Sequence, residues 1–162
     1  MRYLKGNPDS GLGQGGLGSL NVEGLPLTKP PYGRISAIHL DRGDILWQMA
    51  HGETPDNVRN HAKLKGLTLR RTGQPCAGLA GLVVTKTLVI GGECSITATS
   101  TGTRGAMLRA YDKASGKEVG AVPIQTRTSA VPMTFLHNGR QYIVFATGQA
   151  ANTALVALAL PK

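Results

Sequence analysis

A hairpin motif recurs along this chain of 162 residues, and the repeat constrains the fold more than any single segment does. When ISAIHLDRGDILW is laid over LRAYDKASGKEVG, two small residues coincide: Ala37 with Ala110, and Gly43 with Gly116. The run LVAL near the chain end resembles the opening of a third copy, with Ala157 at the shared position. Glycine permits a tight turn, and alanine permits close packing of one sheet on the next. The repeat therefore predicts several similar antiparallel units.

Short apolar runs separated by turn signals predict further strands around the repeat. The run LVVTKTLVIGG at 82–92 fits two short strands, and the segment 130–147 contains Asn138-Gly139, a strong hairpin signal. The 22 glycines fit frequent tight turns. We therefore expect an all-β chain: a partial β-propeller of two to three blades of antiparallel sheet, with long loops.

The chain divides into two parts by composition. Residues 1–31 are rich in Gly, Pro, Ser and Asn and show no period, so they are predicted to be an irregular N-terminal segment. Residues 32–162 are predicted to form the partial propeller. Within them, residues 51–80 form a long polar connection, with a short helical turn expected around 56–64.

The formal charge is +9, which raises the question of an anionic partner. The basic residues are scattered, and the densest group (Lys63, Lys65, Arg70 and Arg71) has no aromatic side chains beside it for base stacking. We interpret this as a generally basic surface and do not expect nucleic-acid binding. No run is long enough for a membrane-spanning helix, and the first residues lack the apolar stretch of a signal peptide.

The chain has two cysteines, Cys76 and Cys94. Two cysteines make neither a disulfide framework nor a zinc site by themselves. They are either paired, in an oxidising compartment, or two buried thiols, and the sequence leaves both possibilities open.

Four residues of metal-ligating type lie in one polar stretch: His51, Glu53, Asp56 and His61. Their spacing matches no standard metal motif, so a solvated loop is the favoured interpretation over a metal site. Structural roles are expected for the two histidines near hairpin turns, His39 and His137. The glycines of GLGQGGLG follow no strand and precede no helix, so no dinucleotide site is expected, and no serine lies in a nucleophile elbow.

The order of the motifs resembles one known family. KPPYGRISAIHLDRGDILWQ, GLVVTKTLVIGGE, MLRAYDKASGKEVGAVPI and VPMTFLHNGRQYIVFATG follow one another as in the C-terminal region of membrane-type glucose and related quinoprotein dehydrogenases. The resemblance covers about residues 25–162. The hairpins also resemble the A-x-D-x-x-T-G-x-x-x-W element of quinoprotein blades, whose Trp packs between neighbouring blades. Trp47 keeps that position, and Gly120 replaces it in the second copy, where we expect no such docking between blades.

The resemblance implies a propeller of about eight blades, with pyrroloquinoline quinone and Ca²⁺ at its central funnel. Such enzymes oxidise alcohols or aldose sugars in the periplasm, where the quinone carries the redox chemistry. The family's catalytic Asp and most of its Ca²⁺ ligands lie upstream of the matching region. No catalytic residue or metal ligand can therefore be assigned here, and we expect this chain not to bind the cofactors or act as an enzyme alone.

Three residues are the candidates for contact with the quinone. Many family members have Gly-Gly followed by His or Trp after the last long strand, where this chain has Thr147-Gly148-Gln149. Gly148 and the amide of Gln149 would face the funnel of a complete propeller. Glu93 follows a strand end at a similar level.

Two other functions remain open. The chain could be a stand-alone binding module, or its incomplete blades could assemble with copies of themselves, because an open set of blades leaves sheet faces and edges uncovered. The expected partners are thus the remaining propeller blades or a second copy, with an alcohol or sugar as substrate of the full enzyme.

Overall fold

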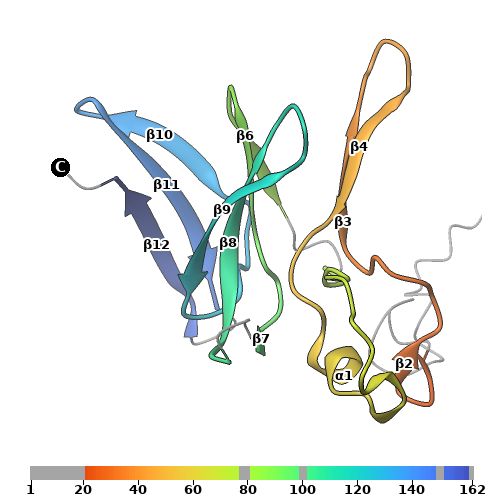
Figure 1. The fold of residues 1–162 in the computed structure, drawn as a ribbon. Helices are drawn as coiled ribbons and strands as arrows, with labels where there is room; N and C mark the ends of the chain where they lie inside the picture. The colour runs from red at the N-terminus through yellow and green to blue at the C-terminus, as the bar shows by residue number, and fades with distance from the viewer. Residues whose placement is uncertain (1–20, 77–80, 99–101, 149–151, 161–162) are drawn as a thin grey trace, which may run out of the picture.

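The computed structural model describes residues 21–76, 81–98, 102–148 and 152–160. Three antiparallel sheets lie side by side in chain order, from the orange β3–β4 pair through the green and cyan strands to the blue strands (Figure 1). The first sheet is β3 (Arg34–Ile38) with β4 (Ile45–Ala50). The second contains β5 (Leu82–Val84), β6 (Leu88–Gly92), β8 (Arg104–Asp112) and β9 (Glu118–Ile124). The third is β10 (Met133–His137), β11 (Arg140–Thr147) and β12 (Ala154–Ala159).

Small elements occupy the connections. A two-stranded ribbon, β1 (Asn21–Val22) and β2 (Leu25–Pro26), precedes the first sheet. The predicted helical turn is confirmed as α1 (Asp56–Arg59) followed by a 3₁₀ turn (Ala62–Leu64). A strand that the sequence pattern did not predict, β7 (Thr97–Ala98), pairs with the start of β8. No helix in the described ranges is long and apolar enough to cross a membrane.

The structure confirms the repeat in the first two hairpins. In each, the strand register shifts directly after the shared alanine, Ala37 in one and Ala110 in the other. The shared glycines also agree, with φ of 74° at Gly43 and 73° at Gly116. An L-residue with a side chain rarely adopts such a φ, so the turn depends on glycine. The two hairpins are therefore one structural unit used twice.

The third sheet contains the third copy. Ala110 of β8 lies opposite Ile90 of β6, and Ala157 of β12 lies opposite Val144 of β11. By this register β10, β11 and β12 match β5, β6 and β8 of the second sheet, and the described residues contain no counterpart of β9 in the third sheet. The predicted all-β class and partial-propeller architecture are confirmed.

The core lies in two layers between the sheets. Alternate residues of a strand point to opposite faces, so the second sheet has an apolar face on each side. On one face, Val89 and Tyr111 pack with Ile35, Trp47 and Met49 of the first sheet. On the other face, a larger set of side chains packs between the second and third sheets: Ile90, Ala106, Leu108 and Ile124 with Ile143, Phe145, Val156 and Leu158.

Candidate functional site

Two of the three predicted quinone contacts, Glu93 and Gly148, are tied to one linking segment. Glu93 follows β6, and its carbonyl accepts hydrogen bonds from the backbone N–H (2.9 Å) and hydroxyl (3.1 Å) of Thr128. Gly148 follows β11, and its N–H donates to the carbonyl of Arg127 at 2.9 Å. Residues 127–128 therefore join the ends of β6 and β11. Gln149 lies outside the described residues.

The carboxylate of Glu93 is bound within the protein. Its side chain has no exposed surface, Oε1 accepts from Nε of Arg109 at 2.7 Å, and Oε2 accepts from the backbone N–H of Met107 at 3.1 Å. Burial raises the pKa of the Glu93 carboxyl, while the charge of Arg109 acts in the opposite direction. Contact between Glu93 and a cofactor stays a prediction.

Arg109 is the centre of an ion-pair network that the sequence reasoning missed. Besides Glu93, its guanidinium donates to Glu53 at 2.7 Å and Glu118 at 3.0 Å. Arg59 pairs in turn with Glu53, and Arg71 with Glu118, so the network contains three cations and three carboxylates. It holds the polar connection against the second sheet.

A signal for this network is present in the sequence. Arg109 stands between Leu108 and Ala110 in a strand whose two faces are both buried, so its guanidinium needs carboxylates close by. The partners come from distant segments, and that pairing is visible only in three dimensions.

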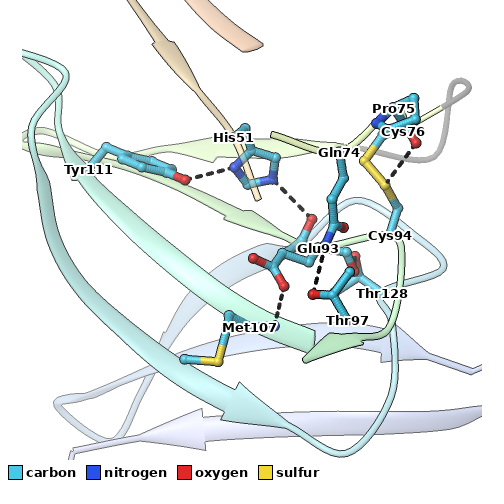
Figure 2. The surroundings of a disulfide bond; sticks show 11 residues. His51, Gln74, Pro75, Cys76, Glu93, Cys94, Thr97, Met107, Tyr111 and Thr128 are labelled. Atoms are coloured by element: carbon cyan, nitrogen blue, oxygen red, sulfur yellow. Dashed lines mark hydrogen bonds between the residues drawn. A yellow bond between two sulfur atoms is a disulfide. The ribbon is translucent and has the colours of Figure 1, made fainter. Parts of the chain in front are cut away.

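His51 is buried, with 4% of its surface exposed, so the solvated-loop interpretation is wrong for this residue. Its Nε2 lies 3.2 Å from the carbonyl of Gly92 and its Nδ1 lies 2.8 Å from the hydroxyl of Tyr111 (Figure 2). Because a carbonyl only accepts, Nε2 carries the proton and Nδ1 accepts from Tyr111. Burial lowers the pKa of His51, and the charges of Arg109 and Arg71 lower it further, so the ring is held neutral.

The other residues of the polar stretch have separate partners. Glu53 binds the arginines described above, and Asp56 accepts from the N–H of Ala98 at 3.0 Å and pairs with Arg104. Nε2 of His61 lies 2.8 Å from the carbonyl of Glu23. The described ranges contain no cluster of three or more His, Cys, Asp or Glu side chains that could hold a metal ion.

Cys76 and Cys94 form a disulfide, which resolves the alternative that the sequence left open. Cys76 lies in the polar connection and Cys94 directly follows Glu93, with 5.7 Å between the two Cα atoms. Figure 2 shows the disulfide beside Gln74 and Thr97, which are joined by a hydrogen bond of 3.2 Å.

A cavity of about 390 Å³ lies beside the disulfide. Its lining combines apolar rings, among them Tyr32 and Pro75, with the polar side chains of Gln74, Ser95 and Thr97. Gln74 is fully buried between the ends of the first and second sheets.

Comparisons with known proteins point to one family. The family model described as PQQ: glucose/ethanol/alcohol dehydrogenase, β-propeller domain, matches residues 11–143. A probable quinate dehydrogenase (quinone) of Xanthomonas campestris pv. juglandis is 31% identical over 81% of this chain. Quinoprotein glucose dehydrogenase A of Acinetobacter calcoaceticus is 28% identical over 88% of it, and the glycerol dehydrogenase large subunit of Gluconobacter oxydans is 32% identical over 77%.

The matched region is a small part of each relative. It spans 15% of the quinate and glycerol dehydrogenases and 17% of the glucose dehydrogenase. No solved structure gave a significant match.

Proposed function

The chain belongs to the glucose/ethanol/alcohol dehydrogenase β-propeller family, and from this premise we propose that it is a propeller segment of a quinoprotein dehydrogenase that oxidises alcohols or aldose sugars. The names of the relatives support an alcohol substrate, because quinate, glucose and glycerol all carry hydroxyl groups. In this family the oxidation uses pyrroloquinoline quinone, which accepts the electrons while the protein binds and orients it.

The stacking of the sheets is the observation that carries the proposal. The face of the first sheet with Ile35 and Trp47 packs on the Tyr111 face of the second sheet. The opposite face of the second sheet, with Ala110, packs in the same way on the third. Because Ala37 and Ala110 occupy equivalent positions, the same face of each unit covers the next unit. Successive blades of a propeller stack in this head-to-tail way.

The same face of the third sheet has no further sheet against it among the described residues. This open face carries Met133, Phe135, Tyr142 and Leu155, and the ring of Phe135 stacks on that of Tyr142. Met133 is 54% exposed and Leu155 is 76% exposed. An apolar face of this kind supports the proposal that another blade covers it in the working protein.

The described residues do not fit a complete quinone site. The carboxylate of Glu93 accepts a hydrogen bond from Arg109, and the N–H of Gly148 donates to the carbonyl of Arg127. We therefore assign no catalytic step to this chain, and propose that the quinone, Ca²⁺ and the catalytic base are held by other blades of a periplasmic enzyme. By this account the chain is inactive alone.

A second function, self-assembly, is favoured by the open face. In the head-to-tail stacking, the open face of one copy would contact the face of the first sheet that points away from the second sheet. Ile38 (53% exposed) and Leu46 (55% exposed) belong to that first sheet. A second copy could place this sheet on the open face, and a contact between two different surfaces closes into a ring when its rotation allows.

Two measurements on the isolated chain test these functions. Dye-linked oxidation of glucose, glycerol and quinate, with pyrroloquinoline quinone and Ca²⁺ added, is expected to show no turnover above the protein-free control, and turnover by this chain would contradict the first proposal. Sedimentation equilibrium tests the second: a ring predicts one oligomer of fixed size, whereas a segment that needs other blades predicts weak association without a fixed size.

A further inference from the structure

The cavity beside the disulfide lies between two segments that the disulfide joins. Residues 74–75 form one wall, and residues 95–97 contribute to another. Cys76 is the next residue after the first wall, and Cys94 is the residue before the second. The covalent bond therefore sets how far these two walls can separate.

Each wall is anchored to a different sheet. The N–H of Gln74 donates to the carbonyl of His51 at 2.9 Å, which fixes the first wall to the end of β4. On the other side, Glu93 is fixed to the linking segment through Thr128, and Thr97 pairs with Gly105 of β8. The disulfide thus links the end of the first sheet to the end of the second.

Few polar contacts cross between the walls directly. Nε2 of Gln74 donates to the hydroxyl of Thr97 at 3.2 Å, and Sγ of Cys94 lies 3.8 Å from the carbonyl of Pro75. A neutral hydrogen bond of this kind contributes on the order of 1 kcal/mol. It is a weak constraint beside a covalent bond.

The two sheets have other contacts that do not depend on the disulfide. Arg109 of the second sheet binds Glu53, which lies close after the end of β4. Trp47 of the first sheet donates from Nε1 to the carbonyl of Lys113 at 3.0 Å. These contacts lie outside the cavity walls. We therefore expect loss of the disulfide to leave the two sheets packed and to free the walls from each other.

The two cysteines of the disulfide differ in exposure. Cys94 is buried, with 4% of its surface exposed, whereas Cys76 is half-buried and follows the exposed Pro75. Thiol–disulfide exchange needs access for an attacking thiolate. Cys76 is the more exposed of the two residues of the disulfide.

We propose that the Cys76–Cys94 disulfide is a redox-sensitive clamp that holds the cavity at its observed width. A dithiol reductant breaks the sulfur–sulfur bond: two electrons and two protons convert the disulfide to two thiols, while the dithiol becomes a cyclic disulfide. Reduction frees residues 74–76 from residues 94–97, and the three sheets stay folded. The inference holds whether or not the chain serves a dehydrogenase.

Hydrogen–deuterium exchange of the folded chain tests the clamp directly, with and without dithiothreitol. Two amides report on the walls: that of Gln74, bonded to His51, and that of Ala98, bonded to Asp56 at 3.0 Å. We expect reduction to speed exchange at both at least tenfold, with amides at the centres of β8 and β9 unchanged. Reoxidation with oxidised glutathione is expected to restore the slow exchange.

The double variant Cys76→Ala with Cys94→Ala is the matched control. It should show fast wall exchange at all times and no response to dithiothreitol. Unchanged exchange at Gln74 and Ala98 after complete reduction of the wild type would overturn the clamp. Equal acceleration in β8 and β9 would also overturn it, because the disulfide would then stabilise the whole fold.

Discussion

Nε of Arg109 donates to Oε1 of Glu93 across 2.7 Å, and the two side chains are 4% and 0% exposed. Each of these two buried charges is stabilised by the other, because loss of either one leaves its partner buried without a counter-charge. Arg109 lies on β8 and Glu93 directly follows β6. The ion pair therefore joins these two strands of the second sheet at the end nearest the disulfide.

The first prediction concerns this pair. Arg109→Ala should lower the free energy of unfolding by about 3–5 kcal/mol, because three carboxylates lose their shared partner and Glu93 is left buried. Urea denaturation measures the change. Glu118→Gln is the matched control: its side chain is 25% exposed, and a change of about 1 kcal/mol or less is expected. A loss at Arg109→Ala no larger than the control would show that the buried pair does not hold the sheet.

The second prediction uses two equivalent glycines. Gly43 and Gly116 have φ of 74° and 73°, so alanine meets the same backbone strain at both, on the order of 1 kcal/mol. Around Gly43 an added Cβ meets no described atom within 4 Å, whereas at Gly116 it lies 2.6 Å from the Trp47 ring. Gly116→Ala should therefore destabilise the chain by at least about 1 kcal/mol more than Gly43→Ala.

The chain has one tryptophan, so its fluorescence reports directly on this contact in denaturant titrations. In a Trp47→Leu background, with unfolding followed by circular dichroism, the difference between the two glycine variants should shrink, as expected of residues in contact. Equal effects of the two alanine substitutions in the wild type would contradict docking of Trp47 on the turn of the second sheet.

The third prediction concerns pH. The pKa of His51 is lowered in the folded chain, so below its unfolded value near 6.5 the unfolded state binds more protons than the folded state. The contribution of His51 to stability is present above that pH and is lost as the pH falls through it, with a slope of at most about 1.4 kcal/mol per pH unit. Urea denaturation between pH 7.5 and 5.5 measures the slope. His51→Gln should flatten it, and an unchanged slope in that variant would contradict the assignment.

The fourth prediction concerns the open face. Leu155→Lys places a charge on this face and should reduce self-association of the isolated chain several-fold, measured by sedimentation velocity over a concentration series. Leu67→Lys is the control, because Leu67 is 61% exposed in the polar connection, outside both sheets of the proposed contact. If both variants associate like the wild type, the open face is not the surface that associates.

Much of the fold could be predicted because it depends on local chemistry. Asn138-Gly139 adopts positive φ at both residues, as a two-residue hairpin needs, and the Ala–Gly pattern located the repeated hairpins. Around Gly120, which stands where the first hairpin has Trp47, an added Cβ meets no described atom within 4 Å, and the expected loss of docking there stays a prediction. The short ribbon at 21–26 lies within the segment predicted to be irregular, and the division into two parts stays a prediction.

The candidate site was harder to predict because its contacts join distant residues. His51 bonds Tyr111 sixty positions away, so nothing in its polar neighbours indicates that it is buried. The pairing of Cys76 with Cys94 depends on the polar connection lying against the end of β6, an arrangement that the sequence does not show. The predicted quinone contacts at Gly148, Gln149 and Glu93 remain predictions.

The central claim is that this chain is a propeller segment without a complete quinone site. Its most direct test is a titration of pyrroloquinoline quinone with the isolated chain in the presence of Ca²⁺, in which the absorbance of the quinone is measured. The account predicts a spectrum that stays that of the free quinone throughout. A saturating change at one quinone per chain, with tight binding, would contradict it.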